Sequence, residues 1–250
     1  MSALLVLLIG QSVGLAGALA LAIGLGVGAP DLRGLEGGLL AGAGTAIGLA
    51  AFYRALAVGT MSIVAPIAAM GAAVPVLVGF VRGESPSLLQ GAGMAVALGG
   101  VFLASRSTGG SGAASTRGIG LALLSAVAIG VGLVGLDIAA EASVLWSVIT
   151  TRAVAGVILA LAFAATNAPA WVTRRDFITL ALIGCIDAGA VGLLAAATTT
   201  GLVGVVSVLG SLYPVTTVLL AQLVLGERLS RTQAVGVGTA LAGVVLIAAG

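Results

Sequence analysis

Long apolar stretches, separated by short polar turns, run through the whole chain. A helix needs about 20 apolar residues to cross the hydrocarbon core of a bilayer. Alternating strand-like segments of the outer-membrane barrel type are absent from the sequence, so helices are the structure that can satisfy the backbone in lipid. The pattern predicts an all-α membrane protein with about nine transmembrane helices, at about 3–27, 36–58, 61–81, 88–105, 118–137, 144–166, 176–198, 202–225 and 233–250.

Composition agrees with a lipid environment and excludes several kinds of chemistry. Hydrophobic residues make up 60% of the 250 and charged residues 7%, with a mean hydropathy of +1.28, whereas soluble domains carry roughly 25% charge. The ten basic residues form no run that could follow phosphates, so nucleic acid is not an expected partner. Cys185 is the single cysteine and there is no histidine. We therefore expect no internal disulfide, metal or cofactor.

The chain also resembles itself. A shift of 143 residues aligns Glu84 with Glu227 and Gln90 with Gln233. Of the 27 residues at 77–103, twelve are identical to their counterparts at 220–246. Both glutamates lie in tight turns, where we expect a helix cap or a charge partner. We interpret the match as a duplication, with a first repeat at 1–105, a linker at 106–117 and a second repeat at 118–250.

The repeat has consequences for topology and function. Five predicted helices fall in the second repeat and four in the first, because the span at 118–137 has no counterpart. We therefore expect one further helix upstream of Met1. A unit with an odd number of spans reverses its orientation when duplicated, and inverted repeats are a common architecture of secondary transporters, with the site near the bilayer midplane.

The second repeat ends in a recognisable pattern: Pro214 within a span, the turn Gly226-Glu227-Arg228, and a closing span with Gln233 and Gly243. This pattern resembles the EamA domains of the drug/metabolite transporter superfamily. The first copy departs from it at Gly71, where the family has Pro, and at Ser85, where it has Arg. The resemblance implies ten helices in a cell membrane, of the bacterial inner-membrane type, and carriage of metabolites or drugs, including efflux.

The resemblance also singles out Arg152, which matches an arginine that family members often carry early in the second helix of a repeat. The first copy offers Gln11 nearby.

Asp187 is the one carboxylate deep inside a predicted span. Such a residue costs at least roughly 2.5 kcal/mol on insertion scales, so it is a functional hypothesis by default. Solute binding or proton coupling is one role, and a structural partner for Arg152 is the other. The two helices concerned are joined by a short loop and should be antiparallel neighbours. Both residues lie roughly 12–16 Å from the same membrane face at 1.5 Å per residue, so we predict a buried Arg152–Asp187 pair beside a central cavity.

Hydroxyl groups near proline give further candidates. Ser207 and Ser211 lie four residues apart on one helix face, and Pro214 removes the N–H that would bond the carbonyl of Gly210. Loosened backbone at membrane depth belongs beside a cavity or inside the protein, while bending and packing of the helices is the alternative role. Ser62 is the repeat-related counterpart. The candidate solute- or ion-binding residues are Asp187, Arg152, Gln11, Ser62, Ser207, Ser211 and Tyr213.

These features favour a secondary transporter that moves a small organic solute by alternating access, with that solute and the lipid bilayer as its partners. A membrane enzyme acting on lipid-linked substrates would need clustered acid and base groups, and the chain has no histidine. A non-transporting accessory subunit is the other alternative. Gly44 and Gly48 form a GxxxG pair, which predicts either close packing within the chain or a homodimer interface.

Overall fold

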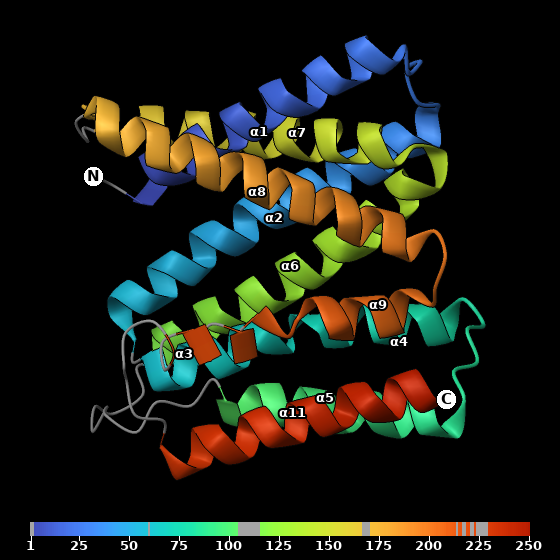
Figure 1. Cartoon of the computed structure of the whole chain (residues 1–250). Coiled ribbons are helices and arrows are strands. Elements are labelled where there is room, and N and C mark those ends of the chain that lie inside the picture. Colours follow the sequence, from blue (N-terminus) through green and yellow to red (C-terminus); the bar gives the residue numbers. More distant parts are fainter. Residues whose placement is uncertain are drawn as a thin grey trace. The chain divides into compact units, whose positions relative to one another are not determined.

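The regular structure of the described residues is helical (Figure 1). This computed structural model describes residues 3–59, 61–104, 116–166, 171–213, 215–216, 219–220, 223 and 230–250. Its helices are α1 (Ala3–Leu25), α2 (Leu32–Val58), α3 (Met61–Ala69), the 3₁₀ turn η1 (Met70–Ala72), α4 (Ala73–Val81), α5 (Leu88–Ala104), α6 (Thr116–Ala142), α7 (Val144–Ala164), α8 (Arg174–Thr198), α9 (Val203–Gly210) and α11 (Arg231–Ala249).

These helices confirm the predicted all-α class. Within the described residues, six helices are long and apolar enough to cross a membrane, namely α1, α2, α7, α8, α11 and the Gly118–Ala142 part of α6. The third predicted span is interrupted by η1, and the eighth begins as α9, which ends at Gly210. Gly210 is also the residue whose carbonyl was predicted to lack its helical N–H donor, because the donor position is taken by Pro214. Pro214 itself lies outside the described residues.

Polar side chains at the turns determine where several helices start. Asp31 Oδ1 accepts the N–H of Gly34 at 2.8 Å at the start of α2. Ser143 and Thr173 cap α7 and α8 in the same way. Each such bond satisfies one of the N–H groups that a helix leaves unpaired at its first turn.

Two of these starts repeat each other after 143 residues. At α5, Ser87 Oγ accepts the N–H of Gln90 at 3.1 Å, and Gln90 Oε1 accepts the N–H of Ser87 at 3.0 Å. At α11, Ser230 and Gln233 form the same reciprocal capping box. The matched glutamines of the two repeats therefore have a common structural role.

The chain forms two compact units, and each takes segments from both sequence repeats. Unit 1 consists of residues 1–50 and 131–200, and unit 2 of residues 51–130 and 201–250. The chain passes from one unit to the other within α2, within α6 and between α8 and α9. The boundaries at 105 and 117 of the sequence repeats stay a prediction.

In unit 2, repeat-related α5 and α11 lie side by side (Figure 1). Gly93 lies against Ile247, and Gly236, the counterpart of Gly93, lies against Ala104, the counterpart of Ile247. Residue numbers rise along α5 as they fall along α11, so the helices are antiparallel. Such reciprocal contacts mark a two-fold relation, and a two-fold axis between antiparallel helices is perpendicular to them. At this contact the two copies therefore have inverted orientations.

Glycine lets the α5 and α11 backbones come close. A Cβ at Gly100 would overlap the backbone of Ala240, and one at Gly243 would overlap that of Ala97, again a reciprocal pair. Small residues at helix contacts in lipid gain stability from close van der Waals packing. The glycines at these positions are therefore required by the packing.

In unit 1, α1 packs against both α7 and α8. Ala18 and Ala22 of α1 form an apolar cluster with Val148 and Ile149 of α7. Helix α1 crosses α8 so closely that a Cβ at Gly184 would lie 2.7 Å from the carbonyl oxygen of Gly10. These contacts bring the middle parts of three helices together.

The GxxxG pair of α2 also serves packing within the chain. Gly44 and Gly48 are both buried, and a Cβ at Gly132 of α6 would lie 3.4 Å from the carbonyl carbon of Gly44. This arrangement fits the close-packing interpretation, and the homodimer interface stays a prediction.

Candidate functional site

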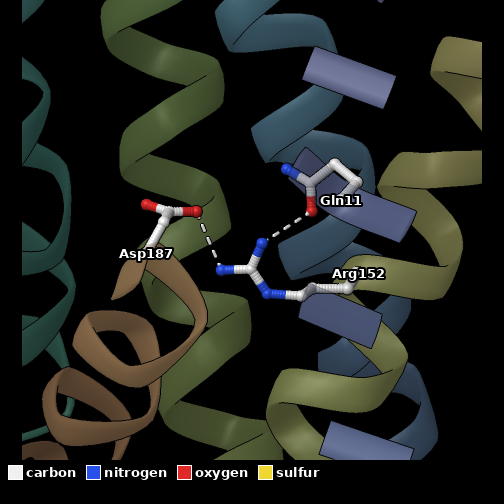
Figure 2. A network of polar contacts seen from close by, with 3 residues as sticks. All are labelled: Gln11, Arg152 and Asp187. Carbon is white, nitrogen blue, oxygen red and sulfur yellow. Dashed lines mark hydrogen bonds and ion pairs between the residues drawn. The ribbon is translucent and has the colours of Figure 1, made fainter. Parts of the chain in front are cut away.

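A buried arginine joins three helices of unit 1. Arg152 Nη2 donates to Asp187 Oδ2 at 2.9 Å, and Arg152 Nη1 donates to Gln11 Oε1 at 3.2 Å. Gln11 comes from α1, Arg152 from α7 and Asp187 from α8. Figure 2 shows Gln11 and Asp187 on opposite sides of the guanidinium. The planar fork of arginine suits such a bridge, because its donors point in fixed directions.

The sequence brings these residues together through helix position and through glycine. Arg152 lies in the first half of α7 and Asp187 in the middle of α8. Gly14, one turn after Gln11, leaves room for the guanidinium, since a Cβ there would lie 3.0 Å from Cδ, Nε and Nη1 of Arg152. Any larger residue at position 14 would press on the bridge.

The predicted Arg152–Asp187 contact is confirmed, but the prediction that both groups are buried is wrong for Asp187. The Arg152 side chain is 2% exposed and the Asp187 side chain 59%. The buried residues of α8 are Leu180, Gly184, Ala195 and Thr198, and Asp187 lies at the edge of that face. The guanidinium of Arg152 is thus buried, while the carboxylate of Asp187 is accessible from one side.

Two polar atoms of consecutive α7 residues are buried without a hydrogen-bond partner in the described part of the chain. They are Arg152 Nε and Thr151 Oγ1. Buried polar atoms are paired in the great majority of cases, and an unpaired one is costly. The first half of α7 thus has unused hydrogen-bonding capacity at both residues.

An apolar cavity of about 460 Å³ lies between α1, α7 and α8. Its lining includes Gly14, Ala18, Val148, Cys185 and Gly192. Gly14 is also the residue that touches Arg152, so the bridge lies directly behind one part of the cavity wall. The cavity can hold an apolar group of a ligand.

The other predicted site residues belong to unit 2. Ser207 is 2% exposed and Ser211 8%, and Ser211 Oγ donates to the carbonyl of Val208 at 2.7 Å. Tyr213 is 54% exposed. The side chain of Ser62 lies outside the described residues. The structure therefore brings Gln11, Arg152 and Asp187 together in unit 1, whereas Ser207, Ser211 and Tyr213 belong to unit 2.

Two features of the structure were not predicted from the sequence. Asp137 was expected at a span end, but α6 continues to Ala142, and Asp137 is a buried residue of the helix at 5% exposure. Glu84 caps a helix, as the sequence predicted, but the capped helix is α9, which is distant in the sequence. The apolar run that continues to Ala140 could have revealed the first feature. The second depends on residues 119 positions apart, which no local pattern reveals.

Comparison with known proteins decides the family. Residues 116–249, more than half of the chain, match the EamA-like transporter family. The chain belongs to this family. It is accordingly a multi-pass membrane protein of a transporter family, and the resemblance seen in the sequence is confirmed.

The fold of this EamA-like protein is also found among solved structures. One crystal structure superposes with a TM-score of 0.84 at 18% sequence identity, covering 99% of this chain and 89% of its own. At this identity the likeness concerns the fold alone. No curated protein matches the chain.

Proposed function

We propose that this EamA-like protein is a secondary transporter that moves a small organic metabolite or drug by alternating access, and that Asp187 is the residue that meets the solute or its coupling proton. The family membership supports transport. The observation that carries the role of Asp187 is the uneven burial of the bridge, 2% against 59%.

The bridge leaves Asp187 free to do more than hold Arg152. Only Oδ2 is used by Arg152, and within the described residues Oδ1 accepts no hydrogen bond. A carboxylate has about four lone-pair sites. Oδ1 can therefore accept a donor group of a solute or take a proton while Arg152 keeps Asp187 in place.

The rest of the architecture supports alternating access. The reciprocal α5–α11 contact relates the two copies by inversion, and inverted repeats that rock against each other around a fixed site are the usual basis of such transport. The network at Asp187 lies in the middle of α8, the depth at which solute sites of these proteins lie.

The test is solute flux into liposomes that contain the purified protein. Thermal-shift screening of small organic solutes would select the compounds, and flux would then be measured for wild type, Asp187→Asn and the control Glu36→Gln, which changes an exposed carboxylate. We expect flux from wild type and the control and none from Asp187→Asn. Equal flux from all three would place the solute elsewhere. Catalytic turnover without flux would show an enzyme, and neither activity would favour an accessory subunit.

A further inference from the structure

Glu84, in the turn between α4 and α5, binds the start of α9 within unit 2. Its Oε1 accepts the N–H of Val203 at 2.8 Å, and its Oε2 accepts the N–H of Gly204 at 3.4 Å. These residues are 119 and 120 positions from Glu84 in the sequence. One carboxylate thus connects two turns that the chain itself does not join.

Glu84 supplies a cap that the local sequence of α9 lacks. Helices α7, α8 and α11 begin at Ser143, Thr173 and Ser230, whose side chains accept a first-turn N–H. Helix α9 begins after Leu202, which has no side-chain cap. A carboxylate at this position also interacts favourably with the positive end of the helix dipole. The start of α9 is therefore held by Glu84.

The surroundings of the carboxylate are shaped for this contact. A Cβ at Gly79 would overlap the carboxylate of Glu84, and one at Gly204 would lie 3.6 Å from its Oε2. Val76 and Phe80 line the same small space. Glu84 is half-buried, so its carboxylate is partly shielded from solvent where it meets α9.

Helix α9 is suited to move as a short piece. It has eight residues, and the helix is interrupted after Gly210 by the turn at Ser211 and Leu212. Its contact with α4 is a main packing contact of unit 2. Interrupted helices at membrane depth are typical moving or binding elements of transporters, and α9 carries the buried Ser207.

We propose that Glu84 is a positioning residue for transport, which holds the start of α9 against α4 in the conformation described here and releases it when the path opens at this end. The inference rests on the proposed function. The carboxylate acts on α9 and not on the solute, so its loss should change the rate of conformational exchange without changing solute affinity.

The experiment combines hydrogen exchange with flux for Glu84→Ala, the isosteric Glu84→Gln and the control Glu36→Ala. We expect amide exchange at Val203 and Gly204 to be roughly 10- to 100-fold faster in Glu84→Ala, as loss of a charge-assisted hydrogen bond implies, and intermediate in Glu84→Gln. Exchange in α7 should not change. The maximal flux of Glu84→Gln should fall about tenfold, with KM unchanged.

Each contrary result has a clear meaning. Unchanged exchange at Val203 in Glu84→Ala, which removes the acceptor, would overturn the cap. Wild-type maximal flux together with faster exchange would reduce Glu84 to a structural cap, which overturns its role in transport. A changed KM would place Glu84 in the solute site, contrary to the proposal. Asp187→Asn separates the two hypotheses, because it should lose flux while Val203 and Gly204 keep their slow exchange.

Discussion

The α5–α11 and α1–α7 contacts are both made by repeat-related helices. The contact residues match between the two copies in α5–α11 but differ between them in α1–α7. In α5–α11, glycine faces the same kind of neighbour in both copies, as Gly100 against Ala240 and Gly243 against Ala97 show. In α1–α7, Arg152 stands where the first copy has Ile9. The scaffold has kept the duplicated sequence, whereas the polar chemistry has arisen where the copies diverged.

All three members of the bridge follow this rule. The counterpart of Gln11 is Val154, and the counterpart of Asp187 is Gly44. Gly44 is buried in α2, while Asp187 is exposed on α8. The network takes Gln11 from the first copy and Arg152 and Asp187 from the second, and none of the three has a polar counterpart in the other copy. An account of transport must therefore be asymmetric even though the α5–α11 packing is symmetric.

Removal of Asp187 is the change that should most disturb the asymmetric contact. Asp187→Ala leaves the charge of Arg152 enclosed, with Gln11 as its remaining partner. Breaking a buried pair from one side typically costs about 3–5 kcal/mol, and we expect a loss near the lower end of this range because the Asp187 side chain is 59% exposed. Thermal unfolding in detergent should show a lower free energy of unfolding than for wild type. Wild-type stability would mean that Arg152 finds another partner at no cost.

The symmetric contact should respond equally in its two copies. Gly100→Ala and Gly243→Ala each force a methyl group into a helix backbone, and overpacking typically costs about 1–3 kcal/mol. Gly99→Ala and Gly238→Ala are the matched controls, because a Cβ at either position meets nothing within 4 Å. Unequal losses for Gly100 and Gly243, measured by thermal unfolding, would contradict the two-fold relation.

Gly14→Ala tests the bridge without removing any of its members. The methyl group would lie 3.0 Å from three atoms of Arg152, a side chain that can shift slightly, so we expect a loss of about 1 kcal/mol, near the lower limit for overpacking. Solute flux should fall clearly in this variant, although most of its free energy of unfolding is kept. A Cβ at Gly24 of α1 meets nothing within 4 Å, so Gly24→Ala should behave as wild type in both measurements.

The capping boxes should give the smallest effect. Ser87→Ala and Ser230→Ala each remove one cap, which is worth about 0.5–1 kcal/mol at an accessible helix start. The two losses should agree within the error of thermal unfolding, since the boxes share one geometry. A loss at only one of them would show that the copies are not equivalent there.

The sequence could predict what depends on local pattern. The helix positions follow from apolar length, and the Arg152–Asp187 contact follows from depth along two antiparallel neighbours. The exposure of Asp187 depends on which helices cover α8, and the bond from Glu84 to Val203 depends on tertiary packing. The capping boxes were predictable, because Ser87 with Gln90 fits the known serine-to-glutamine spacing.

The most direct test of the account is flux and unfolding of the double variant Arg152→Gln with Asp187→Asn, measured on the same preparation. The double variant removes both charges, so the buried guanidinium no longer needs a counter-ion and folding should recover relative to Asp187→Asn alone. The account predicts a stable protein that carries no solute. Transport at the wild-type rate by this stable variant would show that the bridge only holds three helices together, and it would contradict the role of Asp187.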